Sequence, residues 1–124
     1  MSLLHREEAD GRVFEVRSAG RTRRLYVDGV LHTSHNPARE LTGSVWDPLA
    51  LSAHFAEPGA VRSCLLLGVG GGAAVHLLRR HVAPTRIVAV EYDARILSLA
   101  RDWFDLGGDD VEIVAGDAVA WTRR

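Results

Sequence analysis

Two patterns of apolar and polar residues divide the chain. In the first part, short alternating stretches predict antiparallel strands at residues 13–17, 25–27 and 31–33. Asp28-Gly29 joins the last two stretches and predicts a two-residue hairpin, because both central residues of a type I′ turn need positive φ. We therefore expect a small antiparallel β-hairpin region over residues 1–40.

The next segment predicts a connection and then a helix. Asn36-Pro37 favours an irregular connection, because proline lacks a backbone donor and disfavours helix in the residue before it. Apolar residues at near-helical spacing follow, and they predict a helix that begins near Trp46 or Pro48 and ends before Pro58-Gly59.

From residue 61 onward, strands and helices alternate. Continuous apolar runs predict parallel strands buried on both faces, and Asp93 is placed to cap one of the helices between them. The strands are expected at residues 64–67, 87–90 and 111–114, and the helices at 73–81, 94–104 and 118–124. This order predicts an α/β, Rossmann-like half-domain over residues 41–124, with a ligand site at the carboxyl ends of its strands.

Composition and charge narrow the function classes. The chain has 124 residues, of which 47% are apolar, and its formal net charge of -1 argues against nucleic acid or an anionic membrane as a partner. No apolar run approaches the roughly 20 residues that span a bilayer, so we expect a cytoplasmic protein. Cys64 is the only cysteine, which excludes an internal disulfide and a cysteine-based zinc cluster.

A glycine cluster marks the turn from the first of these parallel strands into a helix. Gly68, Gly70, Gly71 and Gly72 would let a ligand approach the backbone where no side chain blocks it. A tight strand-to-helix turn also needs small residues, so the cluster by itself leaves a binding role and a purely structural role open.

Acidic residues follow the other two parallel strands. Glu91 comes 23 positions after Gly68, near the interval of about 20 at which an acid reaches ribose hydroxyls. Asp117 either accepts a hydrogen bond from an adenine amino group or caps the helix that begins at Ala118. Three loops that point into one crevice predict a nucleotide site.

The segments LLLGVGGGAAV, VAVEYDARI and VEIVAGDAVAW resemble the spermidine synthase family, polyamine aminopropyltransferases related to class I S-adenosylmethionine-dependent methyltransferases. The resemblance covers about residues 24–122 and implies a partial class I methyltransferase-type sheet, truncated after its third strand. It implies a transferase of polyamine biosynthesis that binds S-adenosylmethionine or decarboxylated S-adenosylmethionine, with an amine acceptor and no metal.

The same resemblance implies contacts for particular residues. The loop from Gly68 through Val69 to Gly72 would pack against the amino acid or aminopropyl part of the ligand. Glu91 would hold the ribose and Tyr92 would pack against adenine. Asp117, with Ala118 beside it, would recognise the adenine.

The chain also departs from the family pattern. His32 stands where the synthases carry glutamine, and Trp46-Asp47 stands in place of their Tyr-His pair, so these three residues are our weaker candidates for the substrate pocket. The family's catalytic aspartate lies on a later strand, beyond Arg124. No general base can be nominated, and both the acceptor and the choice between methyl and aminopropyl transfer stay open.

Two alternatives to a transferase remain, a non-catalytic adenosyl-binding module or fragment and an NAD-dependent oxidoreductase. Asp117 and the β region fit the oxidoreductase less well.

In the family's sheet the glycine-loop strand is central, so here residues 64–67 should form an exposed edge, and we expect self-association into a homo-oligomer. We interpret His32 and His35 as polar surface residues rather than metal ligands, and His76 as a helix surface or cap residue.

Overall fold

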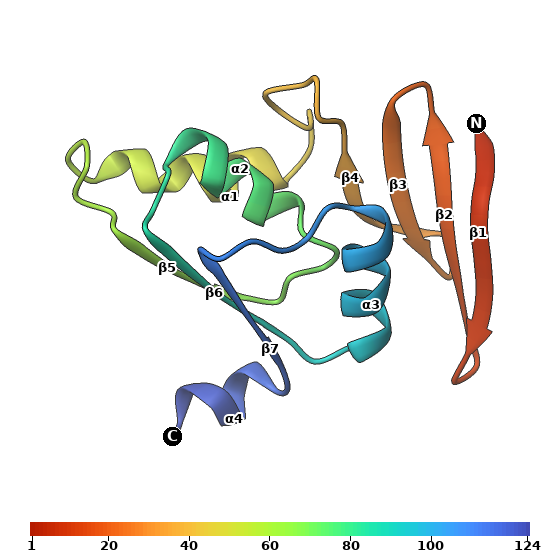
Figure 1. The fold of residues 1–124 in the computed structure, drawn as a ribbon. Coiled ribbons are helices and arrows are strands. Elements are labelled where there is room, and N and C mark those ends of the chain that lie inside the picture. The colour runs from red at the N-terminus through yellow and green to blue at the C-terminus, as the bar shows by residue number, and fades with distance from the viewer.

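The computed structural model describes residues 1–124, which form two separate sheets with helix α3 between them (Figure 1). The first sheet is antiparallel, in the order β1-β2-β3-β4, and confirms the predicted β region. Its strands are β1 (Ser2–Ala9), β2 (Arg12–Ala19), β3 (Thr22–Val27) and β4 (Val30–His35).

Strand β1 is the element that the sequence pattern did not predict. It lies at the edge of the sheet, most of its residues are exposed, and its sequence carries little apolar alternation. The turn into β2 is Asp10-Gly11, whose φ angles of 54° and 73° match those of the predicted Asp28-Gly29 turn, 48° and 78°. This second Asp-Gly dipeptide is the signal that would have revealed the extra hairpin.

The second sheet is parallel, in the order β5-β6-β7, and confirms a partial Rossmann-like arrangement. Helices α1 and α2 lie on one side of this sheet in Figure 1, and α4 lies on the other. The elements are α1 (Trp46–Leu51), a 3-10 turn η1 (Ser52–Phe55), β5 (Ser63–Leu67), α2 (Ala73–His81), β6 (Arg86–Glu91), α3 (Ala94–Trp103), β7 (Val111–Ala115) and α4 (Ala118–Thr122). None of the helices has the length and apolar character that a membrane crossing requires.

Helix α3 contributes to two hydrophobic cores. Its Leu97 and Ala100 belong to the core between the parallel sheet and its helices. Ile96 and Leu99 belong instead to the core against the antiparallel sheet. Because residues three apart share a helix face, these two pairs form two apolar faces, and α3 is held between the two sheets.

Strand β5 differs from the prediction that both of its faces are buried. It pairs only with β6, so it is the exposed edge that the resemblance to the family predicted. Leu66 packs against the first core, whereas Leu65 and Leu67 are 48% and 51% exposed. The reason is that strand side chains alternate between faces, and the helices that contact β5 lie on one face only.

Candidate functional site

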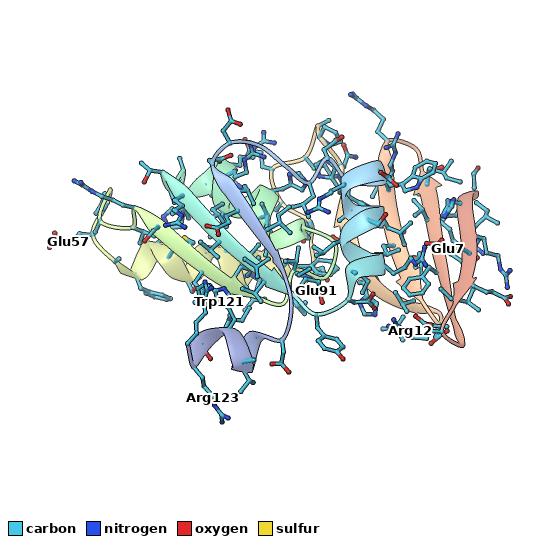
Figure 2. The ribbon with its side chains drawn as sticks, turned by 60° about the horizontal axis from the view of Figure 1, so that its bottom comes forward. Glu7, Arg12, Glu57, Glu91, Trp121 and Arg123 are labelled. Carbon is cyan, nitrogen blue, oxygen red and sulfur yellow. The ribbon has the colours of Figure 1, made fainter.

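The three loops that the sequence singled out lie together at the carboxyl edge of the parallel sheet. Gly68 follows β5, Glu91 ends β6, and Asp117 follows β7. Backbone hydrogen bonds join the loops, because the Gly68 amide donates to the Val90 carbonyl at 2.8 Å and the Gly116 amide donates to the Glu91 carbonyl at 2.9 Å. Figure 2 shows Glu91 at this edge, between the parallel sheet and α3.

The Glu91 carboxylate holds the glycine loop in place. Its Oε1 accepts hydrogen bonds from the Val69 amide at 3.2 Å and the Gly70 amide at 3.0 Å, and its Oε2 accepts from the Asp93 amide at 3.0 Å. A carboxylate oxygen has two lone pairs. Oε1 is therefore fully used, and Oε2 keeps one acceptor position for a ligand.

Most of the glycine loop packs against protein atoms. A Cβ atom on Gly71 would lie 2.6 Å from Thr33 Cγ2, and one on Gly72 would lie 3.3 Å from Leu106 Cδ1. Gly68 is different, since nothing lies within 4 Å of its Cβ position. Val69 is 4% exposed and belongs to the core. Close packing therefore explains Gly71 and Gly72, and Gly68 is the loop residue that is open to a ligand.

Thr33 supports the site but was not predicted from the sequence. Its side chain is fully buried, and its Oγ1 accepts a hydrogen bond from the Ala73 amide, the first of α2, at 3.1 Å. The N-cap position, Gly72, has no side chain, so Thr33 supplies the capping oxygen from β4. The two residues are 40 positions apart, and no local pattern signals the contact.

A cleft of about 420 Å³ opens beside the glycine loop. Five predicted site residues line it: Trp46, Gly68, Val69, Gly70 and Glu91. Glu91 is the only charged residue of the lining. The other lining residues are Leu49, Ala50, Leu66, Leu67, Ala74 and Leu78. An apolar wall with one carboxylate and no basic group suits a ligand that carries positive charge.

Asp47 and His32 do not line this cleft. Asp47 Oδ1 accepts from the Thr42 amide at 2.9 Å and the Thr42 hydroxyl at 2.6 Å, and Oδ2 accepts from the Gly43 amide at 2.7 Å. Burial by itself raises the pKa of Asp47, but the hydrogen bonds from Thr42, Gly43 and Ser44 outweigh it and hold the pKa below its usual value. The carboxylate thus closes the turn ahead of α1.

The adenine candidates lie beyond the cleft. Asp117 Oδ1 accepts from the Val119 amide at 2.7 Å and the Ala120 amide at 3.2 Å, which confirms that Asp117 caps α4, while its Oδ2 makes no hydrogen bond. Tyr92 is 79% exposed. A free carboxylate oxygen and an exposed aromatic ring are thus both available to a base.

His35 and His76 are not the surface residues that the sequence suggested. Their rings stack with centroids 4.1 Å apart, and His76 Nε2 lies 2.6 Å from the Phe104 carbonyl oxygen. The prediction failed because β4, α2 and the chain after α3 meet there. Burial lowers the pKa of His76, and the neighbouring His35 and Arg79 lower it further against the opposing influence of the Phe104 carbonyl and Asp105.

Comparison with known sequences relates the chain to part of the polyamine aminopropyltransferases. It is 33% identical over 106 residues to the polyamine aminopropyltransferases of Mycobacterium tuberculosis and Mycobacterium bovis, a match that covers 81% of this chain and 19% of those proteins. It is 28% identical over 119 residues to an eEF1A lysine and N-terminal methyltransferase homolog of Drosophila pseudoobscura pseudoobscura, covering 94% of this chain and 17% of that protein. No protein-family model matches.

Solved structures show the same fold. A spermidine synthase in complex with the transition state analogue AdoDATO superposes with a TM-score of 0.73 at 13% identity, over 98% of this chain and 43% of that one. A probable spermidine synthase from Corynebacterium glutamicum gives 0.72 at 18% identity, over 98% and 47%. The chain thus has the antiparallel sheet and part of the parallel sheet of the spermidine synthase fold. It spans about a fifth of the length of the curated relatives it matches.

Proposed function

We propose, from the chain's relation to part of the polyamine aminopropyltransferases, that it binds an adenosyl sulfonium compound at the carboxyl edge of its parallel sheet, and prefers decarboxylated S-adenosylmethionine. One observation carries the proposal. Gly68, the open glycine, shares a single cleft with the acid Glu91 and the aromatic Trp46. This combination offers close backbone approach, a hydrogen-bond acceptor and an apolar wall.

The ribose would be bound by Glu91. The free position on Oε2 accepts one ribose hydroxyl, and the second hydroxyl competes with the Val69 and Gly70 amides for Oε1. Binding of the diol should therefore loosen the hydrogen bonds that hold the glycine loop. In this proposal the exposed ring of Tyr92 and the free oxygen of Asp117 would contact the adenine.

The charge of the cleft favours the decarboxylated ligand. S-adenosylmethionine carries a carboxylate in its amino acid portion, and no basic residue lines the cleft to pair with it. Placing an unpaired carboxylate against apolar walls is costly. The decarboxylated form lacks that group and keeps its positive charges, which the Glu91 carboxylate attracts.

The reaction class follows from the ligand. The positively charged sulfur makes its attached carbon open to in-line attack by an amine nitrogen. The new nitrogen–carbon bond would form as the carbon–sulfur bond breaks. Aminopropyl transfer from the decarboxylated ligand would release methylthioadenosine, and methyl transfer from S-adenosylmethionine would release S-adenosylhomocysteine. The amine must also lose a proton. Glu91 is engaged by three backbone amides and is the only acid lining the cleft. Binding is thus the role that these residues carry, and aminopropyl transfer to an amine is the reaction we associate with it.

Calorimetric titration with decarboxylated S-adenosylmethionine, S-adenosylmethionine, methylthioadenosine and NAD tests the proposal. We expect the decarboxylated form to bind most tightly and NAD not to bind. Glu91→Gln should weaken binding roughly 10- to 100-fold, since a hydrogen bond to a charged group contributes about 1.5–3 kcal/mol.

Glu57→Gln is the matched control, because Glu57 is an exposed acid that lies far from Glu91 (Figure 2). Thermal unfolding of both variants establishes that they are folded. Binding of NAD alone would support the oxidoreductase alternative instead. A chain that binds none of the four compounds, or that binds them equally well with Glu91→Gln, would overturn the proposal.

A further inference from the structure

A second cavity, of about 310 Å³, lies against a different face of α2. It is bounded by the ends of β3 and β4, the segment 36–42 and α2, and Figure 1 shows that segment passing from the antiparallel sheet toward α1 and α2. Ala73, His76, Leu77 and Arg80 of α2 line it, whereas Ala74 and Leu78 line the cleft beside Glu91. Only three of its fifteen lining residues are hydrophobic. The two cavities are thus separate sites of opposite character.

The cavity gathers positive charge in a chain whose net charge is -1. Four arginines line it, and Glu40 is its only acid. These arginines are Arg24, Arg39, Arg79 and Arg80. Placing like charges together is unfavourable unless an anion compensates them.

Two of these four guanidinium groups are not used by the fold. Arg79 is committed, because it pairs with Asp110 at 3.1 Å and donates to the Gly107 carbonyl at 2.8 Å. Arg80 donates to the Arg39 carbonyl at 3.1 Å, and its nearest carboxylate, Glu40, is 3.9 Å away. The side chains of Arg24 and Arg39 make no hydrogen bond or ion pair within the chain. Their donors are therefore available to a ligand.

A polar wall completes the cavity. Ser34 stands directly opposite Arg24 in the β3–β4 register, so both side chains lie on the same face of the sheet. Ser34 is largely buried, and its hydroxyl makes no hydrogen bond within the chain. Arg24 is itself half-buried, and a half-buried guanidinium without a carboxylate partner is unusual because desolvating an unpaired charge is costly.

We propose that this cavity is a binding site for a small ligand that bears a phosphate group. Guanidinium groups match the oxygens of a phosphate with paired N–H donors, and the Ser34 hydroxyl can donate to a further oxygen. The volume lies at the lower end of the range for small-molecule sites, roughly 300–1,000 Å³, so it suits a compact ligand and not a polymer. The proposal does not depend on the adenosyl site, since none of these residues lines the cleft beside Glu91.

Titration of the chain with inorganic phosphate and with glycerol 3-phosphate, at ionic strength held constant with sodium chloride, tests the proposal. We expect saturable binding by calorimetry and a rise in the unfolding temperature that chloride does not produce. Tighter binding of glycerol 3-phosphate would identify a phosphate ester as the ligand, and equal binding would identify free phosphate.

Arg24→Gln and Arg39→Gln should each weaken binding about tenfold, because each removes a charge-assisted donor. Neither side chain bonds to the rest of the chain, so both variants should stay folded. Arg62→Gln is the matched control, since Arg62 is exposed, makes no side-chain hydrogen bond and lies outside the cavity. Absence of saturable phosphate binding, or equal loss of binding in the Arg62→Gln control, would overturn the proposal.

Discussion

Replacing Gly71 by alanine should destabilise the chain well beyond what backbone strain alone produces. The new Cβ would lie 2.6 Å from Thr33 Cγ2 and 2.8 Å from Thr33 Cβ, and Thr33 is fully buried. Overpacking of this kind costs about 1–3 kcal/mol. The φ of +111° adds strain of about 1–2 kcal/mol for a residue with a side chain. We therefore expect a loss of about 2–5 kcal/mol in the free energy of unfolding.

Urea denaturation followed by tryptophan fluorescence and circular dichroism measures this loss. Gly59→Ala is the matched control, because its φ is +76° and nothing lies within 4 Å of its Cβ position, so it should show only the strain of about 1–2 kcal/mol. Thr33→Ser removes Cγ2 but keeps the oxygen that caps α2, and in the double variant it should recover part of the loss. Equal destabilisation at Gly71 and Gly59, or no coupling between residues 71 and 33, would refute the packing argument.

Two further predictions concern Asp47 and the edge strand. Asp47→Asn should lower the free energy of unfolding by about 2 kcal/mol near neutral pH, because an amide cannot accept all the hydrogen bonds that the carboxylate accepts. Folding lowers the pKa of Asp47, so the difference in the free energy of unfolding between the wild type and the variant is fully present above the ordinary pKa of 3.8. This difference should shrink as the pH falls through the lower pKa of the folded state. If urea titrations at acid pH gave a constant difference, they would contradict this reasoning. Leu65→Lys should weaken self-association of the chain about tenfold, because Leu65 is exposed on the unpaired edge strand β5. Light scattering measures this association, and a strictly monomeric wild-type chain would contradict the expectation.

Local signals in the sequence predicted much of the fold. The Asp28-Gly29 turn, the cap at Asp93 and the three parallel strands depend on residues close together in the chain, so their patterns could be recognised directly. Strand β1 was missed because an exposed edge strand has no buried face to impose apolar alternation. Only its Asp10-Gly11 turn carries a local signal.

The candidate site was predictable only in part. The sequence placed Gly68, Glu91 and Asp117 at one sheet edge, since the ends of parallel strands must meet there. It could not indicate that Thr33 fills the space beside Gly71, because that contact joins segments distant in the chain. For the same reason it could not distinguish the packed glycines from the open one.

The position of α3 determines how the molecule can move. Because both faces of this helix are occupied, the two sheets have no plane along which they can separate easily. Parting them on one side would expose Ile96, Leu99 and Phe104 to water, at about 1.5–3 kcal/mol for each large apolar side chain. Glu91 lies only three residues before α3 begins, and its Oε2 accepts a hydrogen bond from the amide of Asp93, the N-cap of α3, so its carboxylate is tied to this helix. An acceptor fixed in this way is already oriented before a ligand arrives.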